Sequence, residues 1–154
     1  MKHCILIPIL LSFGFAAQAE EERVVINNFY PLNQENFDLG DHIFHLSDNE
    51  GGFEVVEGPF EDGPARCVGS GFGFKDGTNT ITGICIFGEG TDTFTISWKA
   101  GEQGAPNSWE VVTGQGRYAD MSGSGLATTD VVTSFQALPL RLTRIVGTVD
   151  LDGG

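Results

Sequence analysis

The chain has 154 residues, with 8 Lys or Arg against 21 Asp or Glu, so its formal net charge at pH 7 is −13. A field of this sign repels nucleic-acid phosphates and anionic lipid surfaces, so we expect neither as a partner. The length suits one domain with a hydrophobic core, and 40% apolar residues exclude a disordered tail protein. The 22 glycines oppose long helices and favour a strongly curved β-sheet.

Residues 1–19 have the order of a cleavable export signal. A short basic end precedes an apolar run at 4–15, and residues 17–19 place alanines where a signal peptidase requires small side chains. The run is too short to cross about 30 Å of hydrocarbon comfortably, and acidic residues follow it at 20–22, so a retained membrane helix is the weaker interpretation. We expect a secreted or periplasmic protein, without membrane contact after cleavage, and one domain over 20–154.

The mature chain alternates between apolar and polar residues at the period of β-strands, and no helix-period stretch exceeds two turns. Strands of this spacing predict an all-β fold, an antiparallel eight-stranded closed barrel, with a sandwich as the alternative. In chain order the predicted strands are 24–26, 42–46, 53–57, 66–74, 78–87, 91–98, 108–113, 123–129, 131–136 and 140–149, and the clearest loop is 101–107.

Two cysteines remain after cleavage, Cys67 and Cys85, and an even count in an exported domain predicts a disulfide. The predicted strands 66–74 and 78–87 flank a three-residue loop that ends at Gly77, where a left-handed conformation suits glycine. This hairpin register places Cys67 directly opposite Cys85, within bridging distance. A pair of free thiols is the alternative.

The most distinctive motif is glycine-rich and begins at Gly114. Residues 114–119 satisfy the dinucleotide pattern G-x-G-x-x-[GA], but the strand-then-helix context that this pattern needs is missing. The motif resembles the glycine-rich turn of the allene oxide cyclase-like and dirigent-like barrel superfamily, in which a strand runs into G-x-G-x-[YF]-[AG] and a further strand starts with G-x-G. The matching residues are Gly114, Gly116, Tyr118, Ala119, Gly123 and Gly125, with Gly83, Cys85, Phe87, the acidic turn 89–92 and Trp98 upstream.

This resemblance covers roughly residues 66–147 and implies an eight-stranded barrel of the calycin-like or allene oxide cyclase-like kind with a central cavity. In that superfamily such cavities direct the cyclisation or coupling of reactive apolar intermediates, largely by shape and by excluding water. The acidic turn keeps only Glu89 and Asp92, fewer than the family's aspartate-rich form, which weakens a metal-binding interpretation. Fold alone does not assign an activity.

Conventional catalytic and metal-binding residues are sparse. His42 and His45 point to opposite faces of their predicted strand, and zinc needs three or four ligands, so we expect no metal and no cofactor. The hydrolase signature G-x-S-x-G does not occur. Calcium at Glu89 and Asp92 is the alternative, although an acidic turn without the twelve-residue calcium loop is usually only solvated.

Arg141 and Arg144 fall on opposite faces of the last predicted strand, so one of them can point into the barrel. An arginine in the cavity would favour a ligand with a carboxylate, whereas an ion pair at the rim is the alternative. Trp98, Trp109 and Tyr118 are the residues expected to line a pocket, unless they simply fill the barrel.

The sequence is compatible with two functions, of which one is enzymatic and the other is not. It does not indicate an oligomeric state. The first is an exported barrel that binds a small apolar ligand or a protein partner; the fold alternative, a lipocalin- or avidin-like carrier, lacks the lipocalin G-x-W near the mature start. The second is an isomerase or cyclase acting on an apolar intermediate, with Tyr118, Glu89 and Arg144 as candidate catalytic residues. The interior decides, because a barrel plugged by Phe, Trp and Ile excludes both, whereas a roomy pocket with convergent polar groups favours ligand chemistry.

Overall fold

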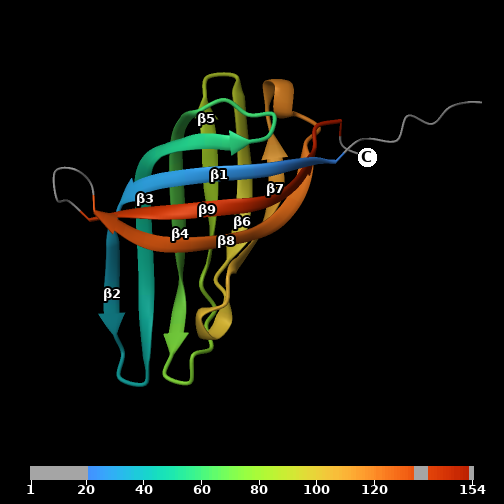
Figure 1. The fold of residues 1–154 in the computed structure, drawn as a ribbon. Helices are drawn as coiled ribbons and strands as arrows, with labels where there is room; N and C mark the ends of the chain where they lie inside the picture. The colour runs from blue at the N-terminus through green and yellow to red at the C-terminus, as the bar shows by residue number, and fades with distance from the viewer. Residues whose placement is uncertain (1–20, 134–138, 153–154) are drawn as a thin grey trace, which may run out of the picture.

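Antiparallel strands close into a barrel, as the sequence predicts (Figure 1). The structure, a computed structural model, describes residues 21–133 and 139–152, so the predicted export signal lies outside the described residues. The sheet order is β1-β9-β8-β7-β6-β5-β4-β3, and β3 pairs back with β1 to close eight strands, while β2 extends the sheet beyond β3. The elements are β1 (Glu22–Pro31), β2 (Gln34–Asp38), β3 (His42–Glu57), β4 (Gly63–Phe74), β5 (Thr82–Glu89), β6 (Asp92–Lys99), η1 (Glu102–Gly104), β7 (Asn107–Gly114), η2 (Gly116–Tyr118), β8 (Ser122–Thr133) and β9 (Pro139–Asp150).

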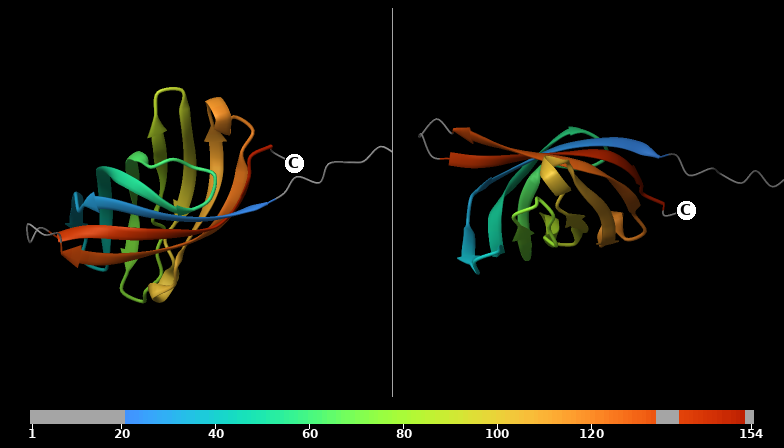
Figure 2. Two further views of the ribbon diagram at one scale, coloured as in Figure 1. Left: turned by 45° about the horizontal axis from the view of Figure 1, so that its top comes forward. Right: turned by 90° about the horizontal axis from the view of Figure 1, so that it is seen from below.

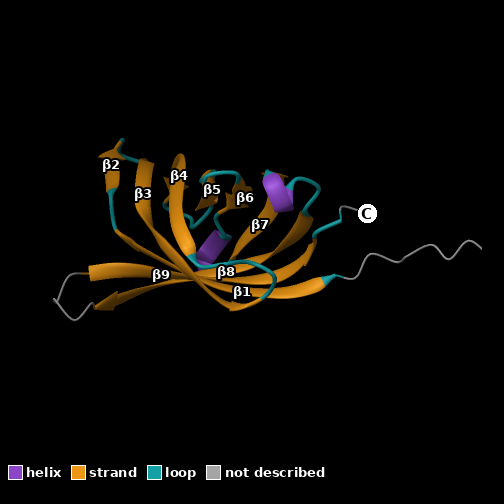
Figure 3. Ribbon diagram, turned by 90° about the horizontal axis from the view of Figure 1, so that it is seen from above, coloured by secondary structure: helices purple, strands orange, loops and turns teal. Residues whose placement is uncertain are grey.

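The sheet is strongly curved, and β1, β9 and β8 cross the direction of β4 to β7 steeply (Figure 1, Figure 2). The long strand β3 joins the two directions, since its first part pairs with β2 and its last part with β1. The two short 3-10 helices η1 and η2 lie at opposite ends of β7 (Figure 3). The barrel therefore has one end near η2 and one end near η1. The two ends differ in how far side chains fill the interior.

Two predicted strand breaks are wrong. The predicted strands 42–46 and 53–57 are parts of the continuous strand β3, and 123–129 runs on without a break into the next predicted strand, which is described as far as Thr133. In β3 a Cβ at Gly51 would overlap the carbonyl oxygen of Phe29, so glycine allows β1 to cross closely. The glycines at 51 and 52 therefore lie within a continuous strand.

Aromatic rings fill the end of the barrel near η2. Phe87 is 0% exposed and stacks on Phe94 with ring centroids 4.9 Å apart. Phe53 meets Phe87 edge-on at 5.1 Å, Phe60 stacks on Phe94 at 4.5 Å, and Tyr118 packs against Phe60 and Phe94. The void left among the core side chains here measures about 10 Å³, the lower limit for a single water. This half of the barrel is therefore a closed core.

Trp98 lies against the inner wall where two paired glycines leave room. Gly83 pairs with Trp98 on one side and with Gly69 on the other. A Cβ on Gly83 would come within 2.5 Å of the indole, and one on Gly69 within 2.6 Å. Part of the glycine content thus makes the wall thin enough for an indole ring to lie across two strands.

Trp109 lies against a second thin section of wall. A Cβ would come within 2.8 Å of its indole at Gly125 and within 2.5 Å at Gly147. The indole Nε1 donates to the carbonyl oxygens of Leu126 and Val146 at 3.3 and 3.2 Å, so its only donor is paired. The second glycine of the G-x-G that begins β8 is therefore explained by packing against Trp109.

We expect Gly83→Ala to lower the free energy of unfolding by about 2 kcal/mol, because the added methyl group overlaps the Val68 carbonyl oxygen and the Trp98 ring. Gly52→Ala is the matched control, since a Cβ at this strand position meets only the Gly63 carbonyl oxygen, at 3.3 Å. Urea unfolding followed by tryptophan fluorescence measures both variants. Equal losses in the two would contradict the packing argument.

Candidate functional site

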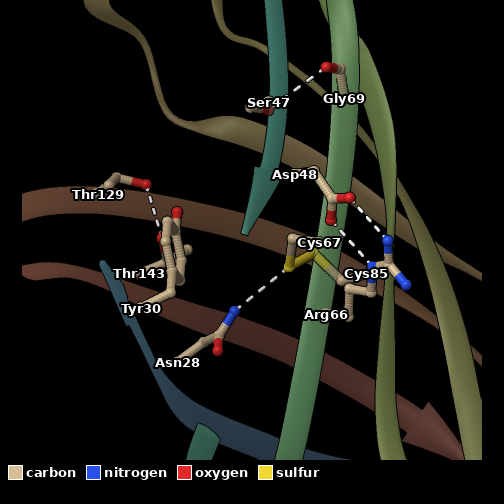
Figure 4. The surroundings of a disulfide bond; sticks show 10 residues. All are labelled: Asn28, Tyr30, Ser47, Asp48, Arg66, Cys67, Gly69, Cys85, Thr129 and Thr143. Atoms are coloured by element: carbon tan, nitrogen blue, oxygen red, sulfur yellow. Dashed lines mark hydrogen bonds and ion pairs between the residues drawn. A yellow bond between two sulfur atoms is a disulfide. The ribbon is translucent and has the colours of Figure 1, made fainter. Parts of the chain in front are cut away.

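The predicted disulfide between Cys67 and Cys85 is confirmed (Figure 4). The two residues are directly paired between β4 and β5, with their Cα atoms 4.1 Å apart. The hairpin loop also follows the predicted register, because the Phe74 amide donates to the Thr78 carbonyl oxygen at 3.0 Å and Gly77 has a φ of 86°. The disulfide joins neighbouring strands in the wall of a cavity.

A cavity of about 380 Å³ occupies the half of the barrel that the aromatic rings leave open. All eight barrel strands and β2 contribute to its lining, so it is an interior space. Trp98, Trp109, Ile96, Ile145 and the disulfide give it apolar walls. Both tryptophans that the sequence singled out thus line this cavity.

A larger hollow, of about 930 Å³, lies over the outer side of β3 to β7. Outward-facing residues dominate its lining, among them a row of cross-strand neighbours, Asp48, Val68, Ile84, Ser97 and Glu110. This hollow is open to solvent, whereas small-molecule sites enclose most of their ligand. The interior cavity is therefore the better candidate site.

Inward-facing residues of β1, β9 and β8 become more polar toward the outer end of the cavity. The pairing of β1 with β9 and of β9 with β8 orders them in rows across the three strands. The deepest row is nearly fully buried, and the outermost is partly exposed. From the inside outward the rows are Ile26, Ile145 and Ala127; Asn28, Thr143 and Thr129; and Tyr30 with Arg141.

The middle row carries a chain of hydrogen bonds (Figure 4). The Tyr30 hydroxyl lies 2.8 Å from Thr143 Oγ1, which lies 2.9 Å from Thr129 Oγ1. Asn28 is 1% exposed; its Nδ2 donates to Cys67 Sγ at 3.4 Å, and its Oδ1 has no partner among the described residues. A buried polar atom left unpaired costs about 1–3 kcal/mol, so a donor on a ligand would be bound favourably here.

Arg141 is the inward arginine of β9. It lines the cavity, and its buried Nε has no hydrogen-bond partner in the described part of the chain. Arg144 is exposed on the other face, where its Nη1 donates to Asn27 Oδ1 at 3.4 Å. His45 also lines the cavity, with Nδ1 2.6 Å from Asn36 Oδ1. Among the described residues that line the cavity, Arg141 is thus the one with a permanent charge.

The three candidate catalytic residues do not meet in this cavity. Tyr118 is 4% exposed and belongs to the aromatic cluster at the opposite end, where burial raises the pKa of its phenol. Glu89 ends β5 and borders, with Tyr118, a separate surface pocket of about 220 Å³. Arg144 lines neither space.

The glycine-rich turn around η2 organises an ion-pair cluster at that opposite end. Gly116 has a φ of 60°, and the next amide, of Arg117, donates to Asp92 Oδ1 at 3.3 Å. The Arg117 guanidinium lies 3.0 Å from Glu61 and 3.3 Å from Asp92, and holds the pKa of the Glu61 carboxyl below its usual range. Because all three side chains are well exposed, we assign the cluster a minor stabilising role. Among the described residues no group of three or more His, Cys, Asp or Glu is placed to hold a metal ion.

No helix in the described part of the chain is long and apolar enough to cross a membrane. Comparisons with protein-family models, with curated proteins and with solved structures found no match for this chain. The candidate site therefore has to be interpreted from its own geometry.

Proposed function

We propose that this chain is an exported barrel protein that binds one small, mainly apolar molecule in the open half of its barrel. The observation that carries the proposal is the division of the interior into a packed aromatic half and a cavity of about 380 Å³. Ligand sites are commonly about 300–1,000 Å³ with apolar walls and a few polar groups. This cavity has both features.

The cavity walls favour an apolar ligand over a purely polar one. Two indole rings, two isoleucines and the disulfide face the space, and apolar surface in contact with water is unfavourable. On β1, β8 and β9 the polar side chains lie in the outer rows, where Tyr30, Thr129 and Thr143 are linked by hydrogen bonds. Such an arrangement orients a ligand that has an apolar body and a polar end.

Export is part of the proposal and rests on two observations. Residues 1–19 have the order of a signal peptide, and the domain carries an intramolecular disulfide. Disulfides persist in oxidising compartments and are rare in the cytosol. The protein therefore acts in a secreted or periplasmic setting.

An isomerase or cyclase of the allene oxide cyclase-like type is the second candidate function. Its support is the resemblance in the glycine-rich turn, together with an enclosed cavity that contains hydroxyl groups. Tyr118, Glu89 and Arg144 do not line this cavity, so Tyr30 and Arg141 are the residues that such chemistry would use.

We expect Ala127→Phe to weaken binding of the neutral probe 4-phenylbutan-1-ol at least about tenfold, measured by isothermal titration calorimetry. Ala127 is 7% exposed and lines the cavity, so the added ring occupies the ligand's space. Leu126→Phe is the matched control, because Leu126 is the preceding residue of β8 and is 55% exposed.

The control should retain the affinity of the original protein within about twofold, and near-ultraviolet circular dichroism checks that both variants are folded. Loss of binding in Leu126→Phe alone would place the site on the outer face of the barrel. Native mass spectrometry of protein from the exported fraction should, in addition, detect a bound small molecule in the original chain and less of it in Ala127→Phe.

A further inference from the structure

We infer that the ligand is a small apolar carboxylic acid whose carboxylate binds Arg141, with its apolar part directed toward Trp98 and Trp109. The inference rests on the proposed function and adds the chemical class of the ligand and its orientation. Three features of the cavity carry it: its charge, the hydrogen-bonding capacity of its outer end, and the order of its rows.

The charge of the cavity is opposite to that of the chain. The sequence has 21 Asp or Glu against 8 Lys or Arg, yet none of the described residues that line the cavity is Asp or Glu. Residues 134–138, which the structure does not describe, are Ser-Phe-Gln-Ala-Leu and include no acid either. An anion at Arg141 therefore meets no carboxylate from the lining.

Three other described arginines have carboxylate partners, whereas the exposed Arg144 contacts an amide oxygen. Arg23 lies 2.9 Å from Glu57, Arg66 lies 2.7 Å from Asp48, and Arg117 pairs with Glu61 as described above. These pairs are on the outer surface, where at least two-fifths of each side chain is exposed.

Arg141 is less exposed than these arginines, and its Nε is buried without a partner among the described residues. A buried guanidinium N–H without a partner costs free energy, and a guanidinium binds a carboxylate through two parallel hydrogen bonds. A ligand carboxylate would provide the partner that the lining lacks.

The outer end of the cavity can supply a further donor. Tyr30, Thr143 and Thr129 have three hydroxyl protons and share two hydrogen bonds, so one proton remains to donate. Tyr30 is the cross-strand neighbour of Arg141. A carboxylate between these two residues would receive hydrogen bonds from a guanidinium and a hydroxyl group.

The order of the rows sets the orientation. Arg141 and Tyr30 lie in the outer row, and Ile145 lies two rows deeper on the same face of β9. A ligand with its carboxylate in the outer row therefore extends its apolar part along the isoleucine toward the two indole rings. The reverse orientation would bury the carboxylate among apolar walls, at a large desolvation cost.

The test compares two probes that share one apolar part, 4-phenylbutyrate and 4-phenylbutan-1-ol, by isothermal titration calorimetry at pH 7. We expect the original protein to bind the acid about tenfold more tightly than the alcohol. Arg141→Gln should remove this preference by weakening acid binding about tenfold, with alcohol binding changed by less than about twofold. Arg141→Lys keeps the charge without the planar fork and should restore part of the preference.

Arg144→Gln is the matched control, because it removes the same charge from the same strand on the outer face and should leave both affinities unchanged. Equal binding of acid and alcohol by the original protein would overturn the carboxylate inference and leave the proposed function intact. An equal loss in Arg144→Gln and Arg141→Gln would also overturn it, since the effect would then be long-range. Failure of both probes to bind the original protein would overturn the proposed function itself.

Discussion

Phe87→Ala is expected to lower the free energy of unfolding by about 3–5 kcal/mol, the largest loss that we predict for a single substitution. Phe87 is 0% exposed and contacts two other rings of the cluster, Phe94 at 4.9 Å and Phe53 at 5.1 Å between centroids. Truncation removes the burial of the ring and leaves a cavity in a part of the barrel that has almost no free space. Urea unfolding with the disulfide intact measures the loss.

Ile86→Ala is the control for this prediction, because Ile86 precedes Phe87 on β5 and is 41% exposed on the outer face. Its loss should be no more than about 0.5 kcal/mol. A loss below about 1 kcal/mol in Phe87→Ala would show that the aromatic half tolerates a void, and the contrast between packed and open halves would then fail. Binding of 4-phenylbutan-1-ol at a temperature where Phe87→Ala is folded should be unchanged, since Phe87 does not line the cavity.

The features that the sequence predicts correctly are local ones. Cys67 is placed opposite Cys85 by the alternation of the strands and the three-residue loop between them. The odd spacing of Arg141 and Arg144 along one strand places them on opposite faces, and only Arg141 lines the cavity. Each of these relations spans one hairpin or one strand, so the period of a β-strand determines it.

The bend of β3 depends on a distant segment and was therefore missed. Position 51 requires a glycine because Phe29 of β1 lies against it in the closed barrel. The sequence of residues 47–52 alone does not indicate that contact. The strand β2 was missed for a different reason: its five residues have one large apolar side chain, Phe37, and β2 pairs only with β3 among the described strands. Closure of the barrel determines the bend of β3, whereas β2 lies outside the eight strands that close.

The site was predicted in part. Trp98 and Trp109 line the cavity as expected, whereas Tyr118 matches the same aromatic pattern and belongs to the closed core. Sequence alone could not separate these three, because the order of the strands around the barrel decides which end each ring occupies. The polar residues Asn28 and Thr143 were overlooked.

A signal for that polar end exists in the sequence. Every second residue of β1 passes from apolar to polar, from Val24 and Ile26 to Asn28 and Tyr30. The inward positions of β9 show the same change in the reverse chain direction, and β8 changes from Ala127 to Thr129. A change from apolar to polar inward-facing residues, in the same direction on neighbouring strands, indicates a barrel with one apolar end and one end that binds polar groups. The change is visible only after the pairing of the strands is known.

The double variant Cys67→Ala/Cys85→Ala is expected to lose about 3 kcal/mol of unfolding free energy and roughly 10 °C in melting temperature. The disulfide closes a loop with a sequence separation of 18 residues, and opening it returns conformational entropy to the unfolded chain. The unfolded double variant should also expose more surface to denaturant, so its urea m-value should increase. Urea and thermal unfolding of both proteins measure these changes.

The same variant can distinguish the cross-link from the packing of its sulfur atoms. Cys67 and Cys85 are 7% and 6% exposed and belong to the core, so removing the sulfurs also removes buried volume. Reduction of the original protein opens the cross-link and keeps both side chains, so it should reproduce most of the loss, whereas the double variant should not respond to reductant. If the reduced protein were as stable as the oxidised one, the contribution would come from packing alone. A large effect of reduction would instead tie the stability of the cavity wall to an oxidising compartment, as the proposed export predicts.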